Sequence, residues 1–218
     1  NGTAIIRATI DNQGNYTITL SGPIDHPEGG GENVLNLGIP VTVEDFAGES
    51  ATATLTVSIE DDGPEASAAA SVVVDEGNLD DGNDDTGSAG DLVGGAKSAS
   101  GTLGLTFGAD GAAAAAAVVL SATGASWAQD GATTGTLTAD HGAWQIEVHA
   151  DGTYTFTLLE PEEHGAQGET DDIVLTIDVT STDFDGDSAT GSFTVTIDDD
   201  MPTAGGSTTV WLDDEDLD

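Results

Sequence analysis

The 218-residue chain carries 41 acidic residues against two basic ones, a formal net charge of −39. Nucleic acids and anionic membranes favour basic surfaces, so we expect neither as a partner. The sequence has no cysteine and no long apolar run, so we expect no disulfide, thiolate metal site or membrane-inserted helix. Disorder, adaptation to high salt and cation binding remain as explanations of the acidity, and recurring apolar segments fit disorder poorly.

Short segments of alternating apolar and polar residues recur along the chain, separated by Gly, Asp and Asn. Alternation with a period of two predicts strands, and many short strands with turn signals predict an all-β sandwich. The alanine run 112–117 predicts either a short helix or a small-residue loop or strand. The expected strands are 3–10, 16–20, 35–43, 52–59, 71–74, 102–107, 118–122, 135–138, 144–148, 154–158, 173–180 and 191–197.

An internal repeat organises the chain. The stretch GNYTITLSGPIDH resembles GTYTFTLLEPEEH, and their tyrosines, Tyr16 and Tyr154, set an offset of 138 residues. The match continues without a gap to Pro64 and Pro202, which indicates a tandem duplication. Because proline ends a central strand, the two prolines mark unit boundaries. The predicted units are residues 1–63, the rear half of a preceding repeat; 64–201, one full repeat; and 202–218, the start of the next.

The leading segment, residues 1–63, raises a structural question of its own. Half a sandwich exposes its core face and an edge strand, which invites pairing. Two explanations stay open: each unit consists of two smaller lobes, or neighbouring chains complete the fold.

The stretch DFDGDS places Asp183, Asp185 and Asp187 at alternate positions around Gly186. Calcium takes six to eight oxygen ligands in flexible geometry, and this turn offers carboxylates and backbone carbonyls close together. Glycine allows the backbone to curl around an ion. The pattern predicts a Ca²⁺ site, and the alternative is a solvated, acidic hairpin tip.

The earlier copy of this stretch reads DFAGES. It keeps Asp45 and Glu49 but has Ala47 where the later copy has its middle aspartate. We therefore expect a weaker or altered Ca²⁺ site there.

A second group of carboxylates flanks the two prolines. If a short linker brings these residues together, one Ca²⁺ ion could bind between consecutive units and stiffen the hinge. The alternative is a solvated acidic linker. The residues concerned are Asp61, Asp62, Asp75 and Glu76 around the first proline, and Asp199, Asp200, Asp213 and Asp214 around the second.

Catalytic signals are weak. His26 and His164 occupy the same repeat position, but no Ser or Cys nucleophile pattern accompanies them. The carboxylates fall in turns and at unit boundaries rather than as a pair in a cleft, as a glycoside hydrolase would need. We therefore do not expect an enzyme.

Three motifs carry a family resemblance: GENVLNLGIPVTVEDFAGESATATLTVSIEDDGP, GTLGLTFGADG and DGTYTFTLLEPEEH. They resemble, over nearly the whole chain, the tandem repeat of giant type I-secreted bacterial adhesins of the RTX and biofilm class. The resemblance implies Ig-like or cadherin-like β-sandwich repeats in tandem that bind Ca²⁺. It also implies that Asp183, Asp185 and Asp187 are ligands, whereas DFAGES departs from the family loop at Ala47.

The expected function is therefore structural. We expect a calcium-rigidified extender of a secreted, cell-surface adhesin, which projects a ligand-binding tip and supports adhesion and biofilm formation. Its expected partners are neighbouring repeats of the same chain, or neighbouring chains. The alternative is a glycan- or peptide-binding module at the adhesin tip, which the repetition disfavours because tip modules are usually unique.

Overall fold

The computed structural model of the protein describes residues 5–27, 31–67, 69–80, 82, 95–165, 171–200 and 209. The regular elements of these residues are strands, apart from one 3₁₀ turn, η1 (Glu76–Asn78). No helix in the described part of the chain could cross a membrane. The strands are β1 (Ile6–Ile10), β2 (Tyr16–Leu20), β3 (Val34–Glu44), β4 (Ser50–Glu60), β5 (Glu65–Ala66), β6 (Val72–Asp75), β7 (Ser98–Thr102), β8 (Leu105–Thr106), β9 (Val118–Ser121), β10 (Ala125–Gln129), β11 (Gly135–Ala139), β12 (Trp144–Val148), β13 (Thr153–Leu158), β14 (Ile173–Thr182) and β15 (Ser188–Asp198).

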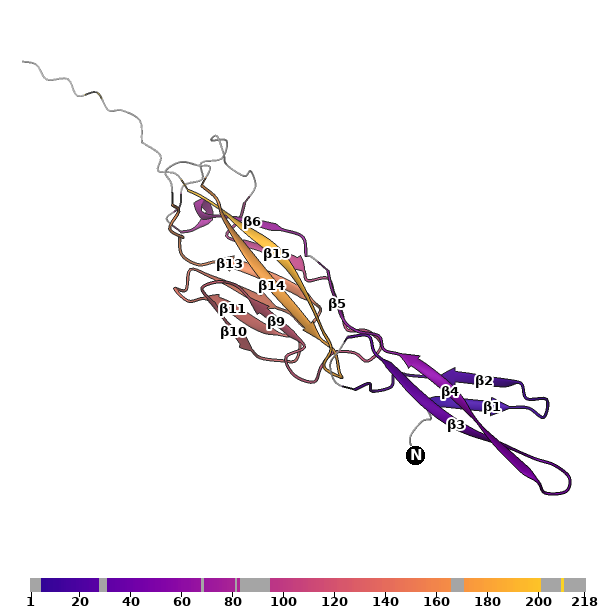
Figure 1. Ribbon diagram of the computed structural model, residues 1–218. Coiled ribbons are helices and arrows are strands. Elements are labelled where there is room, and N and C mark those ends of the chain that lie inside the picture. The colour runs from indigo at the N-terminus through magenta and orange to yellow at the C-terminus, as the bar shows by residue number, and fades with distance from the viewer. Residues whose placement is uncertain are drawn as a thin grey trace, which may run out of the picture.

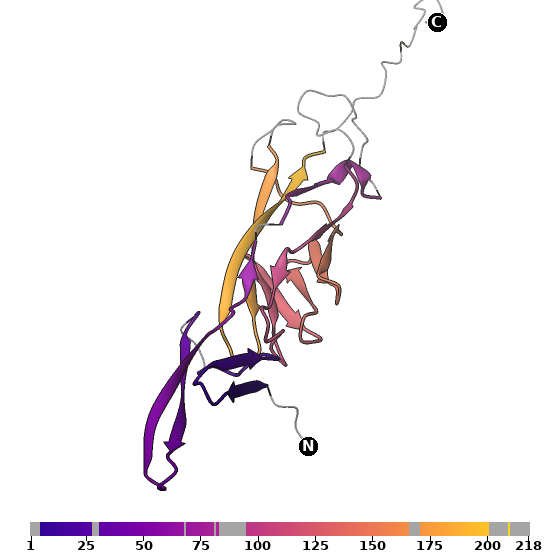
Figure 2. The same cartoon turned by 90° about the vertical axis from the view of Figure 1, so that its right-hand side faces the viewer.

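The expected all-β sandwich is confirmed, and it occupies the larger part of an elongated molecule (Figure 1). A five-stranded sheet in the order β10-β11-β12-β13-β7 faces a four-stranded sheet in the order β6-β15-β14-β9. The short pair β5–β8 lies at one end of these sheets. Beyond that end lie two separate hairpins, β1–β2 and β3–β4, which we call the leading hairpins (Figure 2).

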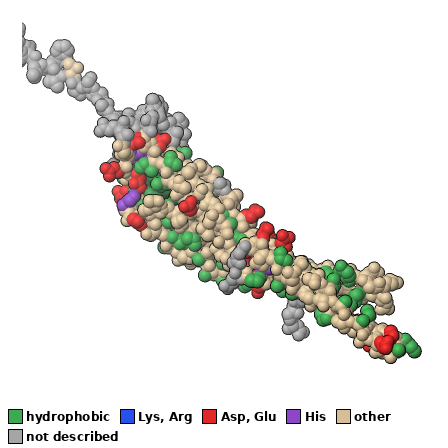
Figure 3. All heavy atoms as spheres, viewed as in Figure 1, with side chains coloured by type: hydrophobic (Ala, Val, Ile, Leu, Met, Phe, Trp, Pro, Cys, Tyr) green, Lys and Arg blue, Asp and Glu red, His purple; other side chains and the backbone are tan. Residues whose placement is uncertain are grey.

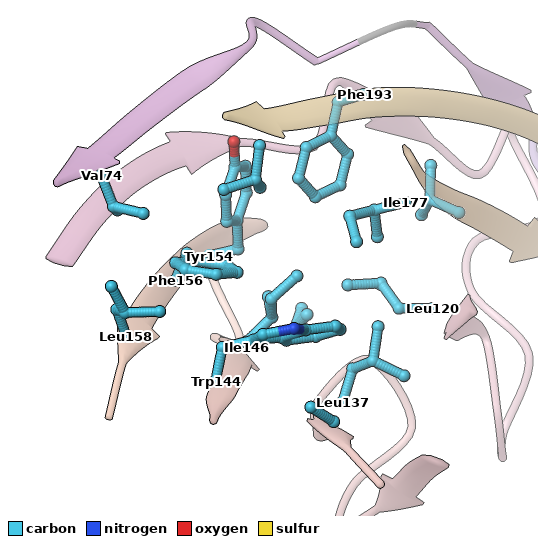
Figure 4. Close-up of a cluster of buried hydrophobic side chains, with 14 of the residues drawn as sticks. Val74, Leu120, Leu137, Trp144, Ile146, Tyr154, Phe156, Leu158, Ile177 and Phe193 are labelled. Atoms are coloured by element: carbon cyan, nitrogen blue, oxygen red, sulfur yellow. The ribbon is translucent and has the colours of Figure 1, made fainter. Parts of the chain in front are cut away.

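The core lies between the two sheets, and it is made of the apolar residues of the alternating strands (Figure 4). Trp144 and Phe156 stack within one sheet with ring centroids 5.6 Å apart. Tyr154 meets Phe193 of the opposite sheet at 4.6 Å. Gly101 makes room for Tyr154, because a Cβ at that position would lie 2.6 Å from the tyrosine ring. These aromatic contacts fix how the two sheets pack.

The duplication seen in the sequence is also visible in the strand pairing. At the offset of 138 residues, β1 and β2 correspond to β12 and β13, and they pair in the same register. Likewise β3 and β4 correspond to β14 and β15, again in the same register. The leading hairpins therefore repeat the four strands that end the sandwich.

Several strands differ from expectation, among them β5, which no expected strand included. The expected strand 102–107 covers only the last residue of β7 and the short strand β8, because Leu103 is buried and Gly104 turns the chain at φ +63. Strand β10 was not expected, since ASWAQ contains small and polar residues around a single Trp127. The alanine run 112–117 forms a loop, which was one of its two expected structures, with an isolated bridge from Ala112 to Asp183.

Candidate metal centre

The leading hairpins meet the sandwich at a region that we call the joint. The backbone amide of Gly31 donates to Asp187 Oδ1 at 3.2 Å, and the amide of Ala109 donates to Asp62 Oδ2 at 2.8 Å. Acidic side chains gather where the two parts meet and again at the opposite end of the sandwich (Figure 3). The tip of the β14–β15 hairpin, residues 183–187, is the part of the sandwich that faces the joint.

The DFDGDS turn has a geometry that its sequence explains. Asp183 Oδ1 accepts hydrogen bonds from the amides of Gly186 at 3.1 Å and Asp187 at 2.8 Å. Gly186 has φ +97, a left-handed conformation in which glycine carries no steric cost. One oxygen of Asp183 therefore holds the turn together, and its second oxygen is left for another partner.

Carboxylates from both sides of the joint converge. His26 and Asp61, from the leading hairpins and their linker, lie with Asp110 and Asp185 of the sandwich. One potential ligand atom from each of these four lies within 4.8 Å of the others. We use the name joint cluster for His26, Asp61, Asp110, Asp183, Asp185 and Asp187.

All of the joint cluster except the half-buried Asp110 is buried, but its carboxylates are poorly satisfied. Asp61, Asp183, Asp185 and Asp187 are at most 7% exposed. Five of their oxygens have no hydrogen-bond partner among the described residues: Asp61 Oδ2, Asp183 Oδ2, Asp185 Oδ1, Asp185 Oδ2 and Asp187 Oδ2. Buried carboxylates without partners are costly, so this arrangement requires either protons or a cation.

The raised pKa values of these carboxyl groups reflect the same cost of burying charge. Burial, together with the neighbouring Asp185 carboxyl, raises the pKa of Asp183 to about 6. Burial and nearby carboxylates also raise the pKa of Asp61 and of Asp110. The chain offers little compensation, because Lys97, one of its two basic residues, forms an exposed ion pair with Asp80 at 3.6 Å.

His26 is oriented by backbone carbonyls. Its Nδ1 lies 2.8 Å from the Ile24 carbonyl oxygen, and its Nε2 lies 3.3 Å from that of Ile59. Carbonyls only accept hydrogen bonds, so both ring nitrogens are satisfied when both carry protons. Burial lowers the pKa of His26, but the Ile59 carbonyl and the Asp61 carboxylate outweigh it and the pKa is raised. A ring held in this way offers no lone pair to a metal and instead supports Asp61, 3.4 Å from Nδ1.

The far end of the sandwich repeats half of this arrangement. His164 and Asp199 are the repeat equivalents of His26 and Asp61, and they lie with Glu76. His164 Nε2 is 3.4 Å from Glu76 Oε1, while its Nδ1 contacts the Asp171 carbonyl at 2.6 Å. Glu76 Oε1 also accepts the Glu162 amide at 2.6 Å. Burial raises the pKa of Glu76.

The structure merges two of the sites expected from the sequence. Asp61, expected at the linker, lies with Asp185 of the DFDGDS turn, and burial with that neighbour raises its pKa. The expected convergence of Asp61 with Asp75 and Glu76 is wrong. Because β6 runs parallel to β15 and pairs Asp75 with Asp198, it carries Asp75 and Glu76 to the far end of the sandwich.

The remaining expected ligands lie elsewhere. Asp45 and Glu49 are exposed at the tip of the β3–β4 hairpin, where Asp45 Oδ1 accepts the amides of Ala47 and Glu49 at 2.8 and 2.9 Å. Asp200 follows β15 at the far end beside Asp199. Asp213 and Asp214 lie outside the described residues.

Two members of the joint cluster, His26 and Asp110, were not among the residues expected at a metal site. The sequence signal for His26 was its repetition as His164, at the same offset that relates Asp61 to Asp199. Asp110 carries no such signal, because the loop that contains it occurs once in the sequence.

Comparisons with known proteins give no match of any kind: no protein family, no curated protein and no solved structure matches this chain.

Proposed function

We propose that the chain is a calcium-rigidified extender segment of a bacterial cell-surface adhesin, in which Ca²⁺ binds at the joint between consecutive repeats. The observation that carries the proposal is the set of five buried carboxylate oxygens without partners, contributed from both sides of the joint. A cation at their centre would neutralise charges that the chain itself leaves largely uncompensated.

The chemistry of the donors favours calcium. The unpartnered atoms are all carboxylate oxygens, and His26 is withheld from coordination by two carbonyls. Hard, oxygen-only sites suit Ca²⁺ or Mg²⁺ rather than Zn²⁺ or Cu²⁺. Between the two, several carboxylates on a flexible turn suit the six to eight ligands of Ca²⁺, whereas Mg²⁺ demands octahedral geometry and keeps its waters.

A bound ion would stiffen the hinge between the leading hairpins and the sandwich, because its ligands come from both parts. Asp61 belongs to the linker after β4, and Asp185 belongs to the β14–β15 tip. An ion that binds both is bound only when the hinge is closed, so it stabilises that state by RT ln(1 + [Ca²⁺]/Kd). Without the ion, the carboxylates repel one another and favour an open hinge.

The role as an extender has two supports. The leading hairpins and the sandwich lie end to end, and the far end presents His164, Asp199 and Glu76 as the start of an equivalent joint. The motifs also resemble the tandem repeats of type I-secreted adhesins, which implies a secreted protein at the cell surface with a part in adhesion and biofilm formation.

The test is small-angle X-ray scattering of the chain in CaCl₂, MgCl₂ and EDTA at one ionic strength. Calcium should lengthen the particle and narrow its distribution of shapes at concentrations where MgCl₂ has little effect. Asp185→Asn should abolish the change, whereas Asp45→Asn, which removes the same charge from an exposed tip, should retain it. Identical scattering in EDTA and CaCl₂ would refute the proposal.

A further inference from the structure

The leading hairpins expose residues whose repeat equivalents form the core of the sandwich. Tyr16 is 58% exposed, whereas its equivalent Tyr154 is fully buried. Leu20 is 50% exposed, whereas Leu158 is 1% exposed. The leading hairpins thus carry large apolar side chains of the kind that form the core of the sandwich, and the described residues leave these side chains about half exposed.

The strands of the leading hairpins also lack the neighbouring strands that their equivalents have in the sandwich. In the sandwich, β11, β7, β9 and β6 pair with the outer edges of β12, β13, β14 and β15 respectively. Among the described residues, β1 pairs with β2 and β3 pairs with β4, with no strand on their other edges. Both the apolar face and four strand edges therefore lack what covers their equivalents.

We propose that this face binds the front half of a further repeat, a segment with the strand pattern of residues 64–143. In the sandwich, residues 64–143 provide the strands β6, β7, β9, β10 and β11, which complete the two sheets that contain β12–β15. The occupant needs the equivalents of these five strands. The binding mode is strand addition to open edges combined with burial of apolar side chains. This inference does not depend on the bound cation.

A second copy of this chain is the weaker candidate for the occupant. The sequence holds two equivalent rear halves, 6–63 and 144–201, but one complete front half, and the sandwich already uses that front half. If two copies exchanged front halves, the leading hairpins of one copy would be covered only by exposing β12–β15 of the other copy. The exposed face consequently needs an additional front half.

The occupant would also complete the chemistry of the joint. In the sandwich, Glu76 follows β6 and its Oε1 lies 3.4 Å from His164 Nε2. A docked front half would bring its own equivalent of Glu76 to His26, the repeat equivalent of His164. The docked segment would thus bring a carboxylate to His26 in addition to covering the apolar face and the strand edges.

The experiment extends the full chain by its own front half. A second copy of residues 64–143 is fused directly ahead of Ile6, because Ala143 precedes Trp144 and Trp144 is the repeat equivalent of Ile6. Amide hydrogen exchange is then followed for β1–β4 in the original and extended chains, in EDTA and in CaCl₂. We expect β1–β4 of the extended chain to exchange as slowly as β12–β15 in both buffers.

The matched control carries Leu120→Asp and Leu137→Asp in the added segment alone, since both leucines are fully buried in the sandwich. It should leave β1–β4 exchanging as in the original chain. Unchanged exchange in the extended chain, or equal protection in the control, would overturn the inference. So would an original chain that is dimeric by light scattering with β1–β4 already protected, because a second copy would then be the occupant.

Discussion

Ala109 donates its backbone amide to Asp62 Oδ2 across the joint at 2.8 Å, which ties the linker after β4 to a loop of the sandwich. The neighbouring residue Asp61 points into the joint cluster instead and has one oxygen without a partner. Two adjacent aspartates thus have different roles: one makes a direct contact, and the other is suited to a cation.

Asp62→Ala should loosen the joint to the same extent with and without calcium. The substitution removes one exposed hydrogen bond to a carboxylate, with an expected loss of about 1 kcal/mol in local stability. Faster exchange of the Ala109 amide measures this effect. Asp62→Asn keeps an acceptor and should be milder, and an effect of Asp62→Ala confined to CaCl₂ would assign Asp62 to the cation instead.

Asp185→Asn should change stability in opposite directions in the two buffers. In EDTA it removes a buried, unpartnered charge, so the unfolding temperature should rise. In CaCl₂ it removes a ligand, so the increase in unfolding temperature caused by calcium should largely disappear. Calorimetric scans of this variant and of Asp45→Asn separate ligand loss from the loss of one of the 41 acidic charges. Parallel behaviour of the two variants would speak against a site.

The pH dependence follows from the raised pKa of Asp183, about 6. Because the folded pKa exceeds the unfolded value, the protonated carboxyl stabilises the fold below about pH 4, and this contribution is lost as the pH rises through 6. The raised pKa values of Asp61 and Asp110 act in the same direction. Stability in EDTA should therefore fall from about pH 4 to pH 7, while the stabilisation by calcium grows over the same window. A calcium effect that is constant across this range would contradict the account.

A pair of core substitutions tests the two copies of one position. Ile177 is fully buried, and its repeat equivalent Ile39 is half-buried. Ile177→Ala should lower the free energy of unfolding by about 2–5 kcal/mol, whereas Ile39→Ala should cost clearly less. Urea unfolding of each variant measures the difference. Equal losses would mean that the leading hairpins already have a packed core.

The strands could be predicted where apolar alternation is regular, as in β12–β15 and their counterparts β1–β4. The prediction failed where a single backbone feature decides the outcome. Gly104 separates β7 from β8 by adopting a positive φ, and β10 depends on pairing with β11 rather than on its own pattern. Tertiary contacts of this kind leave little trace in a local sequence window.

The candidate site was predictable in its residue types but not in its assembly. The DFDGDS turn identifies itself by sequence, since alternating carboxylates around glycine suit a cation. The direction of β6 could not be read from the sequence. Its parallel pairing with β15 places Asp75 and Glu76 at the opposite end of the sandwich from Asp61. Proximity along the chain was therefore a poor guide to which carboxylates share an ion.

Calorimetric titration of Ca²⁺ into the chain, into Asp185→Asn and into Asp45→Asn, at neutral pH and fixed ionic strength, shows whether the joint carboxylates bind calcium. We expect a saturable site in the original chain that persists in Asp45→Asn and is lost or greatly weakened in Asp185→Asn. Equal binding in all three proteins, or heats that NaCl reproduces, would show that the joint carboxylates do not hold calcium.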